Sequence, residues 1–352
     1  MSIMSDTAEK EQTIDLQATV KDILSIIDQE REREIITRRF GLYERRETLE
    51  QIGELLGITR ERVRQLEKAI LNKLKTATES GKVTSINSIE KVIVRKLTEL
   101  GRIARVQDLT SHLLNNTSDQ RERAHVAFIA ELAPGLTVVN ENDNYFHSVG
   151  IKDYGDEKKI RAEVDEIVAT IKKHGEPLTI EQLHDQLSYE HPDHVRALAS
   201  VSKLLAHLKD SWGLVKWPTV NPKNIRDKIY VILAENTKPM HFSEIAGSIK
   251  DSSFKRKNVT TQAIHNELIK DNRFVLIGRG IYALNSWGFD RGTVADIIAE
   301  VLKQSTTPLH RDEIVKRVLK SRQVKETTIL LNLQSKPQFK RVAKATYAYE
   351  QK

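Results

Sequence analysis

The chain has 352 residues, 39% of them hydrophobic and 30% charged, and carries a formal net charge of +7. This length can hold several domains, and the composition favours a folded, mainly helical protein. Cysteine is absent, which excludes disulfides, thiolate zinc sites and a cysteine nucleophile. No apolar run approaches the ~18 residues of a membrane-spanning helix, and the first residues lack a signal-peptide pattern, so we expect a cytoplasmic protein.

The charge is unevenly distributed along the chain. Residues 1–30 carry a net charge of −5, residues 31–75 carry +4, and residues 76–223 are nearly neutral at −2. The C-terminal residues 303–352 carry +8. Positive potential concentrated in two segments suits a polyanion, because each phosphate that a cation neutralises releases condensed counterions.

Residues 1–78 are predicted to form one helical domain. Leu16, Val20, Leu24 and Ile27 recur at helical spacing near its start. We expect this segment to pack as the first helix of the domain.

Two helices joined by a tight turn are predicted within Thr48–Lys75. Thr48 begins the first helix with a capping box, Gly57 ends it where a positive φ is needed, and Thr59 caps the second helix. Apolar residues of the second helix fall on one stripe, and the opposite face carries Arg60, Glu61, Arg64, Gln65 and Lys68. This pattern predicts a helix-turn-helix, whose second helix reads base edges from the major groove of DNA.

Residues 31–75 resemble region four of the housekeeping-type (sigma-seventy) bacterial sigma factors, in the sequences RERE-II-RRFGL, TLEQIGELLG and TRERVRQLE. The resemblance implies binding to double-stranded promoter DNA and docking on the β flap of RNA polymerase. It also implies base contacts by Arg60, Glu61, Arg64 and Gln65, and phosphate contacts by Thr48, Thr59, Arg62, Lys68 and Lys73. The side-chain chemistry agrees, because Arg pairs with guanine, Gln with adenine and Glu with cytosine N4. The alternative is a helical hairpin whose charged face is only solvated.

After a polar joint at residues 76–87, one pattern recurs four times: a helix, a polar break, a β-like residue or two, and a second helix. The four passages are Val92–Leu114, Val164–Leu187, Ile229–Ile249 and Ile297–Leu319. A third helix and a strand-turn-strand follow each, which is the order of a winged helix. In the second copy we expect the third helix over residues 195–210 and the hairpin over 212–220. In the third copy we expect the wing to turn at Gly278–Gly280.

The predicted fold is therefore mainly α. It consists of the helix-turn-helix domain at residues 1–78 and winged-helix-like units at residues 88–151, 158–222, 224–288 and 292–350.

The third unit, at residues 225–287, resembles the HARE-HTH winged helices in the sequences PMHF, at residues 239–242, and GIYAL, at residues 280–284. The fourth unit, at residues 292–350, resembles the same family more weakly, in PLH at residues 308–310 and in Tyr347-Ala348. The resemblance implies either nucleic-acid binding or protein docking, and does not choose between them.

Basic residues gather at groove-reading positions of the third and fourth units. The expected phosphate contacts are Lys255, Arg256, Lys257, Arg279, Lys316, Arg317, Lys320 and Arg322. A merely solvated surface is the alternative. The first two units carry no net positive charge, so we expect spacers or protein-binding units there.

No catalytic constellation stands out in the sequence. His184, His191 and His194 could form a metal set, but no second group of matching ligands accompanies them, so we expect no metal and no cofactor. The Gly278–Gly280 turn lacks the glycine spacing of a phosphate loop. We expect a protein that is not an enzyme.

The leading interpretation is a bacterial DNA-binding transcription regulator. We do not expect a complete sigma factor, because the chain has no row of exposed aromatic residues to capture unstacked bases during strand opening. One alternative is an RNA polymerase accessory protein that docks on the β flap and whose winged helices bind protein. The other is a DNA-targeting subunit of a restriction or defence system.

Overall fold

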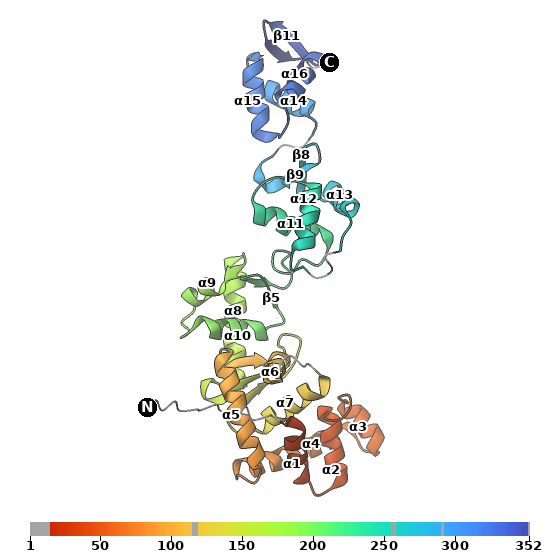
Figure 1. Cartoon of the computed structure of the whole chain (residues 1–352), viewed down its shortest axis with the longest axis vertical. Coiled ribbons are helices and arrows are strands. Elements are labelled where there is room, and N and C mark those ends of the chain that lie inside the picture. Colours follow the sequence, from red (N-terminus) through yellow and green to blue (C-terminus); the bar gives the residue numbers. More distant parts are fainter. Residues whose placement is uncertain (1–14, 115–118, 255, 257, 290–291, 351–352) are drawn as a thin grey trace, which may run out of the picture. The chain divides into compact units, whose positions relative to one another are not determined.

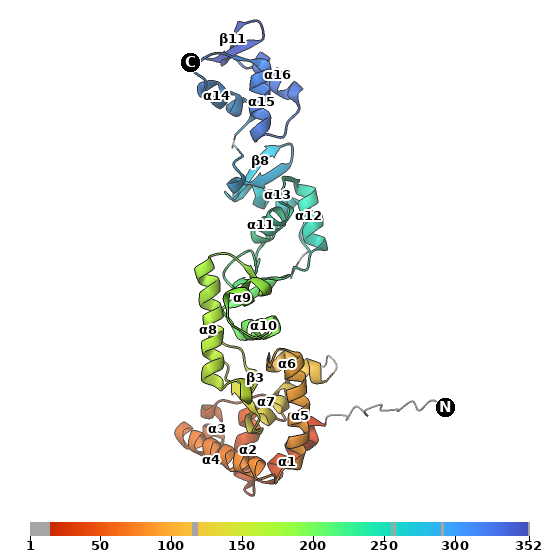
Figure 2. The ribbon, with the colours of Figure 1, turned by 90° about the vertical axis from the view of Figure 1, so that its left-hand side faces the viewer.

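The computed structural model describes residues 15–114, 119–254, 256, 258–289 and 292–350 (Figures 1 and 2). Within these ranges it has sixteen α-helices and four small three-stranded antiparallel sheets, which confirms the predicted fold class. The chain divides into two compact units, residues 1–215 and 216–352, which are described separately below. No helix of the described residues is both long and apolar enough to cross a membrane.

The N-terminal helices are α1 (Leu16–Ser25), α2 (Glu30–Phe40), α3 (Leu49–Leu56) and α4 (Arg60–Glu79). Asp15 starts α1, where its Oδ1 accepts a hydrogen bond from the backbone N–H of Ala18 at 2.8 Å. The predicted apolar stripe is buried, with at most 4% exposure at Leu16, Val20, Leu24 and Ile27. This segment forms the first helix, but it packs mainly against the helices at Thr84–Glu99 and Gln120–Leu132, which lie outside the predicted domain at residues 1–78.

A small apolar cluster holds α2, α3 and α4 together. Ile35, Ile52 and Val63, one from each helix, are fully buried in it. The chain passes close to itself at Gly53, where a Cβ would lie 2.7 Å from the carbonyl oxygen of Ile58. This packing fixes the angle between α3 and α4, and with it the face that α4 presents to solvent.

The second half of α4 belongs to a larger core. Ile70 and Leu74 pack in one apolar cluster with α5 (Thr84–Glu99) and α7 (Gln120–Leu132). The prediction of a polar joint at residues 76–87 was wrong. The helix α4 continues to Glu79, and four residues of the predicted joint are buried: Ala77, Thr78, Val83 and Ile86. These buried positions were not recognised in the sequence, because polar residues lie between them.

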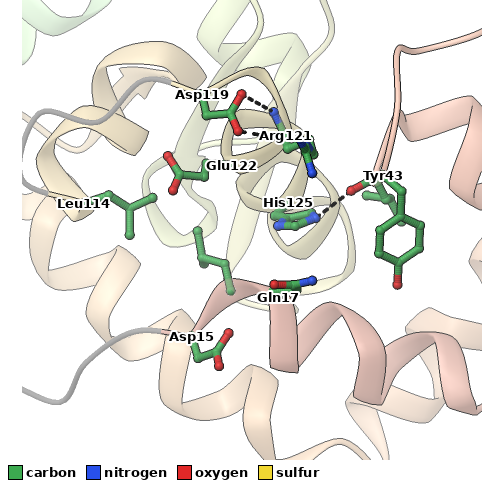
Figure 3. Close-up of a pocket in the computed structure, with 10 residues that line it drawn as sticks. Asp15, Gln17, Tyr43, Leu114, Asp119, Arg121, Glu122 and His125 are labelled. Carbon is green, nitrogen blue, oxygen red and sulfur yellow. Dashed lines mark hydrogen bonds and ion pairs between the residues drawn. The ribbon is translucent and has the colours of Figure 1, made fainter.

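A pocket of about 300 Å³ lies where α1 and the loop after α2 meet α7 (Figure 3). Buried His125, on α7, has its Nε2 2.8 Å from the carbonyl oxygen of Leu42. Gln17, on α1, and Tyr43 line the same pocket. A polar contact therefore adds to the apolar core that joins the N-terminal helices to α7.

Four winged-helix units follow, each in the order helix, strand, helix, helix, strand, strand. The first has α5, β1 (Ile103–Arg105), α6 (Val106–Leu113), α7, β2 (Leu136–Val139) and β3 (Ser148–Ile151), followed by the 3₁₀ turn η1 (Lys152–Tyr154). The second has α8 (Glu157–His174), β4 (Leu178–Thr179), α9 (Ile180–Gln186), α10 (Pro192–Val201), β5 (Leu205–Leu208) and β6 (Ser211–Leu214).

The third and fourth units repeat the same order. The third has α11 (Ile225–Asn236), β7 (Met240–His241), α12 (Phe242–Asp251), α13 (Thr261–Lys270), β8 (Phe274–Gly278), β9 (Ile281–Leu284) and the 3₁₀ turn η2 (Asn285–Trp287). The fourth has α14 (Val294–Lys303), β10 (Leu309–His310), α15 (Arg311–Ser321), α16 (Glu326–Ser335), β11 (Phe339–Ala343) and β12 (Thr346–Tyr349).

Sheet topology and burial confirm the predicted fourfold pattern. In every unit the last strand lies between the other two, in the orders β1-β3-β2, β4-β6-β5, β7-β9-β8 and β10-β12-β11. The equivalent residue of each second helix is fully buried, at Leu109, Leu183, Ile245 and Ile314. The wing of the third unit turns at Arg279 and Gly280, and the φ of +72° at Gly280 explains the glycine there.

The prediction for the end of the second unit was wrong. Residues 195–210 do not form one helix, because α10 ends at Val201 and Leu205–Leu208 is the strand β5. This strand pairs with β6, so that His207 lies opposite Trp212. The run of leucine and alanine suits either a helix or a strand, and pairing with β6 decides between them.

The wing of the first unit is joined to the second unit by backbone contacts. Tyr145, in the β2–β3 loop, forms an isolated antiparallel bridge with Ser202. The N–H of Phe146 donates to the carbonyl of Val201 at 2.8 Å, and the N–H of Lys203 donates to that of Asn144 at 2.7 Å. The loop that would serve as a free wing is therefore occupied within the chain.

Candidate nucleic-acid interface

Side-chain caps position the two helices of the helix-turn-helix as the sequence predicts. The hydroxyl of Thr48 accepts from the N–H of Gln51 at 3.3 Å, and the amide oxygen of Gln51 accepts from the N–H of Thr48 at 2.9 Å. The hydroxyl of Thr59 accepts from the N–H of Arg62 at 3.2 Å, which starts α4. Gly57 lies between them at φ +66°. The caps give hydrogen-bond acceptors to free backbone N–H groups at the start of each helix.

The exposed face of α4 carries all four residues expected to contact bases. The side chains of Arg60, Glu61 and Arg64 are 70%, 59% and 54% exposed, and Gln65 is also exposed. Val63 points the opposite way into the core. This face presents arginine, carboxylate and amide groups, the types that pair with base edges.

Three of these residues form a hydrogen-bonded network on the helix surface. Arg64 donates to Glu61 twice, from Nε at 2.8 Å and from Nη2 at 2.6 Å. Gln65 Nε2 donates to the same carboxylate at 3.3 Å. Hydrogen bonding from Arg64 lowers the pKa of Glu61 to about 2, and hydrogen bonding to Glu61 raises the pKa of Arg64. The pair is therefore fully ionised near neutral pH.

The residues expected near phosphates have different surroundings. Arg62 is exposed, and its Nη1 lies 3.4 Å from Gln65 Oε1. Lys68 is exposed one turn further along α4. Lys73 instead forms an ion pair with Asp28, at 2.9 Å between Nζ and Oδ2, which ties α4 to the loop before α2.

In the third unit, Lys255 and Lys257 lie outside the described residues. Arg256 is exposed with φ +54°, and its carbonyl oxygen accepts from the buried Lys228 at 2.9 Å. Arg279 is exposed at the tip of the wing. Among the expected phosphate contacts in the described part of this unit, Arg279 lies at the tip of the wing.

In the fourth unit, Lys316 and Lys320 are exposed on α15. Arg317 is also exposed there, and forms an ion pair with Glu313 at 2.7 Å. Arg322 differs, because it is only 6% exposed and its guanidinium donates to the carbonyl of Leu276 in β8. Next to it, the N–H of Gln323 donates to the carbonyl of Ile277 at 3.1 Å. Arg322 thus joins the third and fourth units.

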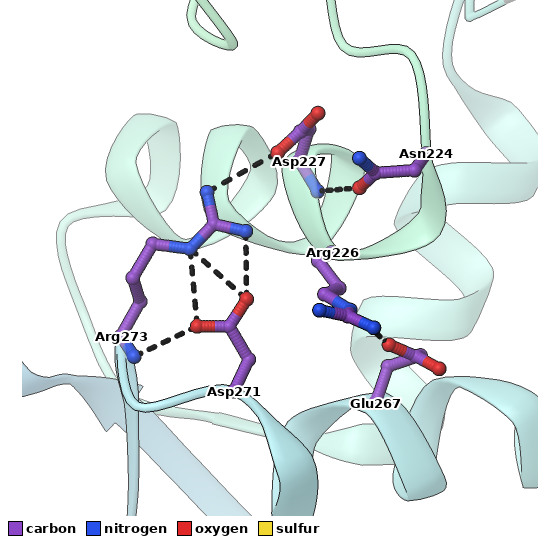
Figure 4. A network of polar contacts seen from close by, with 6 residues as sticks. All are labelled: Asn224, Arg226, Asp227, Glu267, Asp271 and Arg273. Atoms are coloured by element: carbon purple, nitrogen blue, oxygen red, sulfur yellow. Dashed lines mark hydrogen bonds and ion pairs between the residues drawn. The ribbon is translucent and has the colours of Figure 1, made fainter.

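A polar network inside the third unit engages further basic residues (Figure 4). Arg273 forms ion pairs with Asp271 at 2.7 Å and with Asp227 at 3.2 Å. Arg226 pairs with Glu267 beside it. The pairs tie α11 to α13 and to the start of β8, and they neutralise these arginines within the fold.

Two of the three histidines considered for metal binding, His191 and His194, have structural partners. The ring of His191 caps α10, and Nδ1 of His194 lies 2.8 Å from the carbonyl oxygen of Gly101. Among the described residues, no three His, Asp or Glu side chains lie together as a metal site would need.

Sequence reasoning missed the ion pair between Glu61 and Arg64, and the burial of Arg322. The first could have been found from the spacing, because side chains three apart on a helix are neighbours. The second depends on a contact between two units, for which the sequence of neither unit carries a signal.

Comparison with known proteins identifies the family of the helix-turn-helix. Residues 29–76 match Sigma-70, region 4. RNA polymerase sigma factor RpoS of Coxiella burnetii is 42% identical over 80 residues, which are 22% of this chain and 22% of that protein. RNA polymerase sigma factor RpoD of Helicobacter pylori is 45% identical over 64 residues, which are 18% of this chain and 9% of that protein. RNA polymerase sigma factor sigB of Arabidopsis thaliana is 50% identical over 46 residues, 13% of this chain and 8% of that protein.

The chain spans less than a quarter of the length of these relatives. The matched residues contain α2, α3 and most of α4, with their caps and exposed arginines. Residues 29–76 are a Sigma-70 region 4 domain.

Proposed function

We propose that this protein is a transcription regulator that reads promoter-like double-stranded DNA through α4. The observation that carries the proposal is the exposed face of Arg60, Glu61, Arg64 and Gln65 on a Sigma-70 region 4 domain. A helix that presents such groups can enter the major groove, where each base pair has its own pattern of donors and acceptors. Arg62 and Lys68, on the same helix, contact phosphates.

The protein locates promoter-like DNA, and it does not act as a complete sigma factor. The family model of Sigma-70, region 4 matches residues 29–76, and the described chain after Glu79 folds as winged-helix units. Strand opening needs surfaces that capture unstacked bases. The protein therefore marks duplex DNA for other proteins to open.

RNA polymerase is the protein partner that we propose. The relatives of residues 29–76 are RNA polymerase sigma factors. Docking on the β flap would place the regulator beside the enzyme, and the winged helices would then add contacts to DNA or to protein. In the second candidate function, polymerase docking is the main role and DNA reading is secondary.

We propose further that the third and fourth units are HARE-type winged helices. In the third unit the residues that carry this resemblance contact one another: His241 pairs with Ile281, and the N–H of Phe242 donates to the carbonyl of Gly280 at 2.9 Å. In the fourth unit the N–H of Arg311 donates to the carbonyl of Ala345 at 2.8 Å in the same way. These units add weak contacts to the backbone of DNA, and tethering raises the effective concentration of each module.

Selection of binding sites from random duplex DNA by the full-length protein tests the DNA-reading role. Arg64→Ala should cost about 1–3 kcal/mol and relax the preference at one base pair. Arg95→Ala removes an exposed arginine of α5 and serves as the matched control. An identical site profile for wild type and Arg64→Ala would refute base reading by α4.

Co-purification with core RNA polymerase separates the two candidate functions. If docking on polymerase is direct, association should survive nuclease treatment and the double substitution Arg60→Ala and Arg64→Ala. Loss of association in the double variant would mean that DNA mediates it.

A further inference from the structure

A cleft of about 780 Å³ lies between the helix-turn-helix domain and the first winged-helix unit. One wall comes from the end of α2, the loop that follows it and α4. The other comes from α6, α7 and the β2–β3 loop. Its volume falls within the ~300–1,000 Å³ of small-molecule sites. The cleft lies within residues 1–215, where the helix-turn-helix domain and the first winged-helix unit share one apolar core.

The three carboxylates that line the cleft are already neutralised. Glu67 pairs with Arg39 at 3.0 Å, Glu131 pairs with Lys75 at 2.7 Å, and Glu141 pairs with Lys203 at 2.7 Å. Each carboxylate already has its own cationic partner, so a further cation of the lining feels them only through longer-range attraction, as Glu67 and Glu141 act on Arg46.

Arg46 is such a cation. Within the described parts of the chain its side chain forms neither a hydrogen bond nor an ion pair. Desolvation, followed by the charge of Arg39, lowers the pKa of Arg46 below its usual value. The residue as a whole is nevertheless exposed, so a ligand can reach it. An arginine that is partly desolvated and unpaired gains most from an anionic ligand.

The fold holds Arg46 in this position through Gly41. A Cβ at Gly41 would lie 2.7 Å from the backbone nitrogen of Arg46, and the φ of +69° at Gly41 suits glycine. The N–H of Glu47 donates to the carbonyl of Arg38 at 2.9 Å and closes the loop back onto α2. The position of Arg46 is therefore set by the backbone.

The rest of the lining offers groups for a heterocyclic base. Three amide residues are among the lining, and their side-chain amides form no hydrogen bonds with other described residues: Gln107, Gln120 and Asn140. Amides can donate to and accept from a base edge. The partly buried ring of Phe40 supplies apolar surface beside them.

We propose that this cleft binds a nucleoside phosphate, with its phosphate on Arg46 and its base toward the amides. The ligand is either a free nucleotide or one nucleotide of a single strand, since both present a phosphate next to a base. The inference is independent of base reading by α4, because none of the four base-contacting candidates lines the cleft.

Equilibrium binding to the full-length protein tests the proposal with three probes: fluorescently labelled ATP, labelled oligothymidylate and inorganic pyrophosphate as a competitor. We expect saturable binding of one labelled probe, weakened about tenfold or more by Arg46→Ala, because a charge-assisted hydrogen bond is lost. Arg45→Ala, in the same loop but outside the lining, should leave affinity within about twofold. Thermal unfolding of both variants checks that they fold like wild type.

Each outcome decides the proposal. Arg46-dependent binding of ATP assigns a free nucleotide, and Arg46-dependent binding of oligothymidylate assigns a single strand. Absence of binding by both probes, or equal loss in Arg45→Ala and Arg46→Ala, overturns the proposal. Pyrophosphate that competes as tightly as unlabelled ATP also overturns it, because only an anion site would remain. Arg60→Ala with Arg64→Ala should leave this binding unchanged even where duplex reading is lost.

Discussion

Arg64 and Glu61 are joined by two hydrogen bonds, of 2.8 and 2.6 Å, across one turn of α4 on the face expected to meet DNA. If α4 reads DNA as proposed, Arg64 approaches the duplex with its fork of donors already engaged. It must either exchange Glu61 for a guanine or bring the carboxylate with it toward a neighbouring cytosine. The pair also fixes the position of the guanidinium before binding.

The titration of Glu61 measures this pair directly. Its pKa is lowered to about 2 from the usual 4.5, so the pair is intact above pH 4.5 and is lost as the pH falls toward 2. Carboxyl chemical shifts followed by NMR should give a midpoint near pH 2 in wild type. In Arg64→Ala the midpoint should move back toward 4.5. A wild-type midpoint near 4.5 would show that the pair does not form in solution.

Ile52→Ala should destabilise the helix-turn-helix. Ile52 is fully buried between α2 and α4, and truncation leaves a cavity that costs about 2–5 kcal/mol. Denaturant unfolding of the full-length protein measures the change. Leu55→Ala on the same helix is the control, because Leu55 is 54% exposed and its loss should cost far less. Equal effects of the two substitutions would contradict the packing described here.

Ala345→Gly should stabilise the fourth unit. Ala345 has φ +56° in the turn between β11 and β12, at the position that Gly280 occupies in the third unit. A non-glycine residue in this region destabilises the folded state by about 1–2 kcal/mol. Glycine removes this strain, and its greater freedom in the unfolded chain offsets part of the gain. A rise in the unfolding temperature is expected. The reverse change, Gly280→Ala, should lower it.

Substitution of Arg322 should affect stability, whereas substitution of Lys320 should affect DNA binding. Arg322→Ala leaves the carbonyl of Leu276 without its donor and should lower the free energy of unfolding by about 1–3 kcal/mol. Lys320 is exposed on α15, so Lys320→Ala should leave stability unchanged and reduce the salt dependence of duplex binding by about one phosphate. If Arg322→Ala changes only the salt dependence, its contact with Leu276 is not formed in solution.

Local signals predicted most of the fold. The caps at Thr48 and Thr59 and the turn at Gly57 need only neighbouring residues, and the structure forms each of them. The fourfold repeat was visible because each unit must bury one residue of its second helix, such as Leu109. The strand Leu205–Leu208 was misread because its pairing with β6 is not visible in its own composition.

The candidate site was predictable to the extent that it lies on one helix. The periodicity of α4 placed Arg60, Glu61, Arg64 and Gln65 on one face. Non-local contacts set the rest. Lys73 looked free in the sequence but pairs with Asp28, 45 residues away. Arg46 lines a cleft whose other wall comes from the first winged-helix unit, so no local motif marks it as a site.

The central claim is that α4 directs this protein to promoter-like DNA. Genome-wide DNA crosslinking of the protein in its native cell, alongside the polymerase β subunit, tests it most directly, with the Arg60→Ala and Arg64→Ala double variant in parallel. We predict that wild-type sites coincide with polymerase at promoters and that the double variant loses them. Sites scattered away from promoters, or promoter sites that persist in the double variant, would contradict the claim.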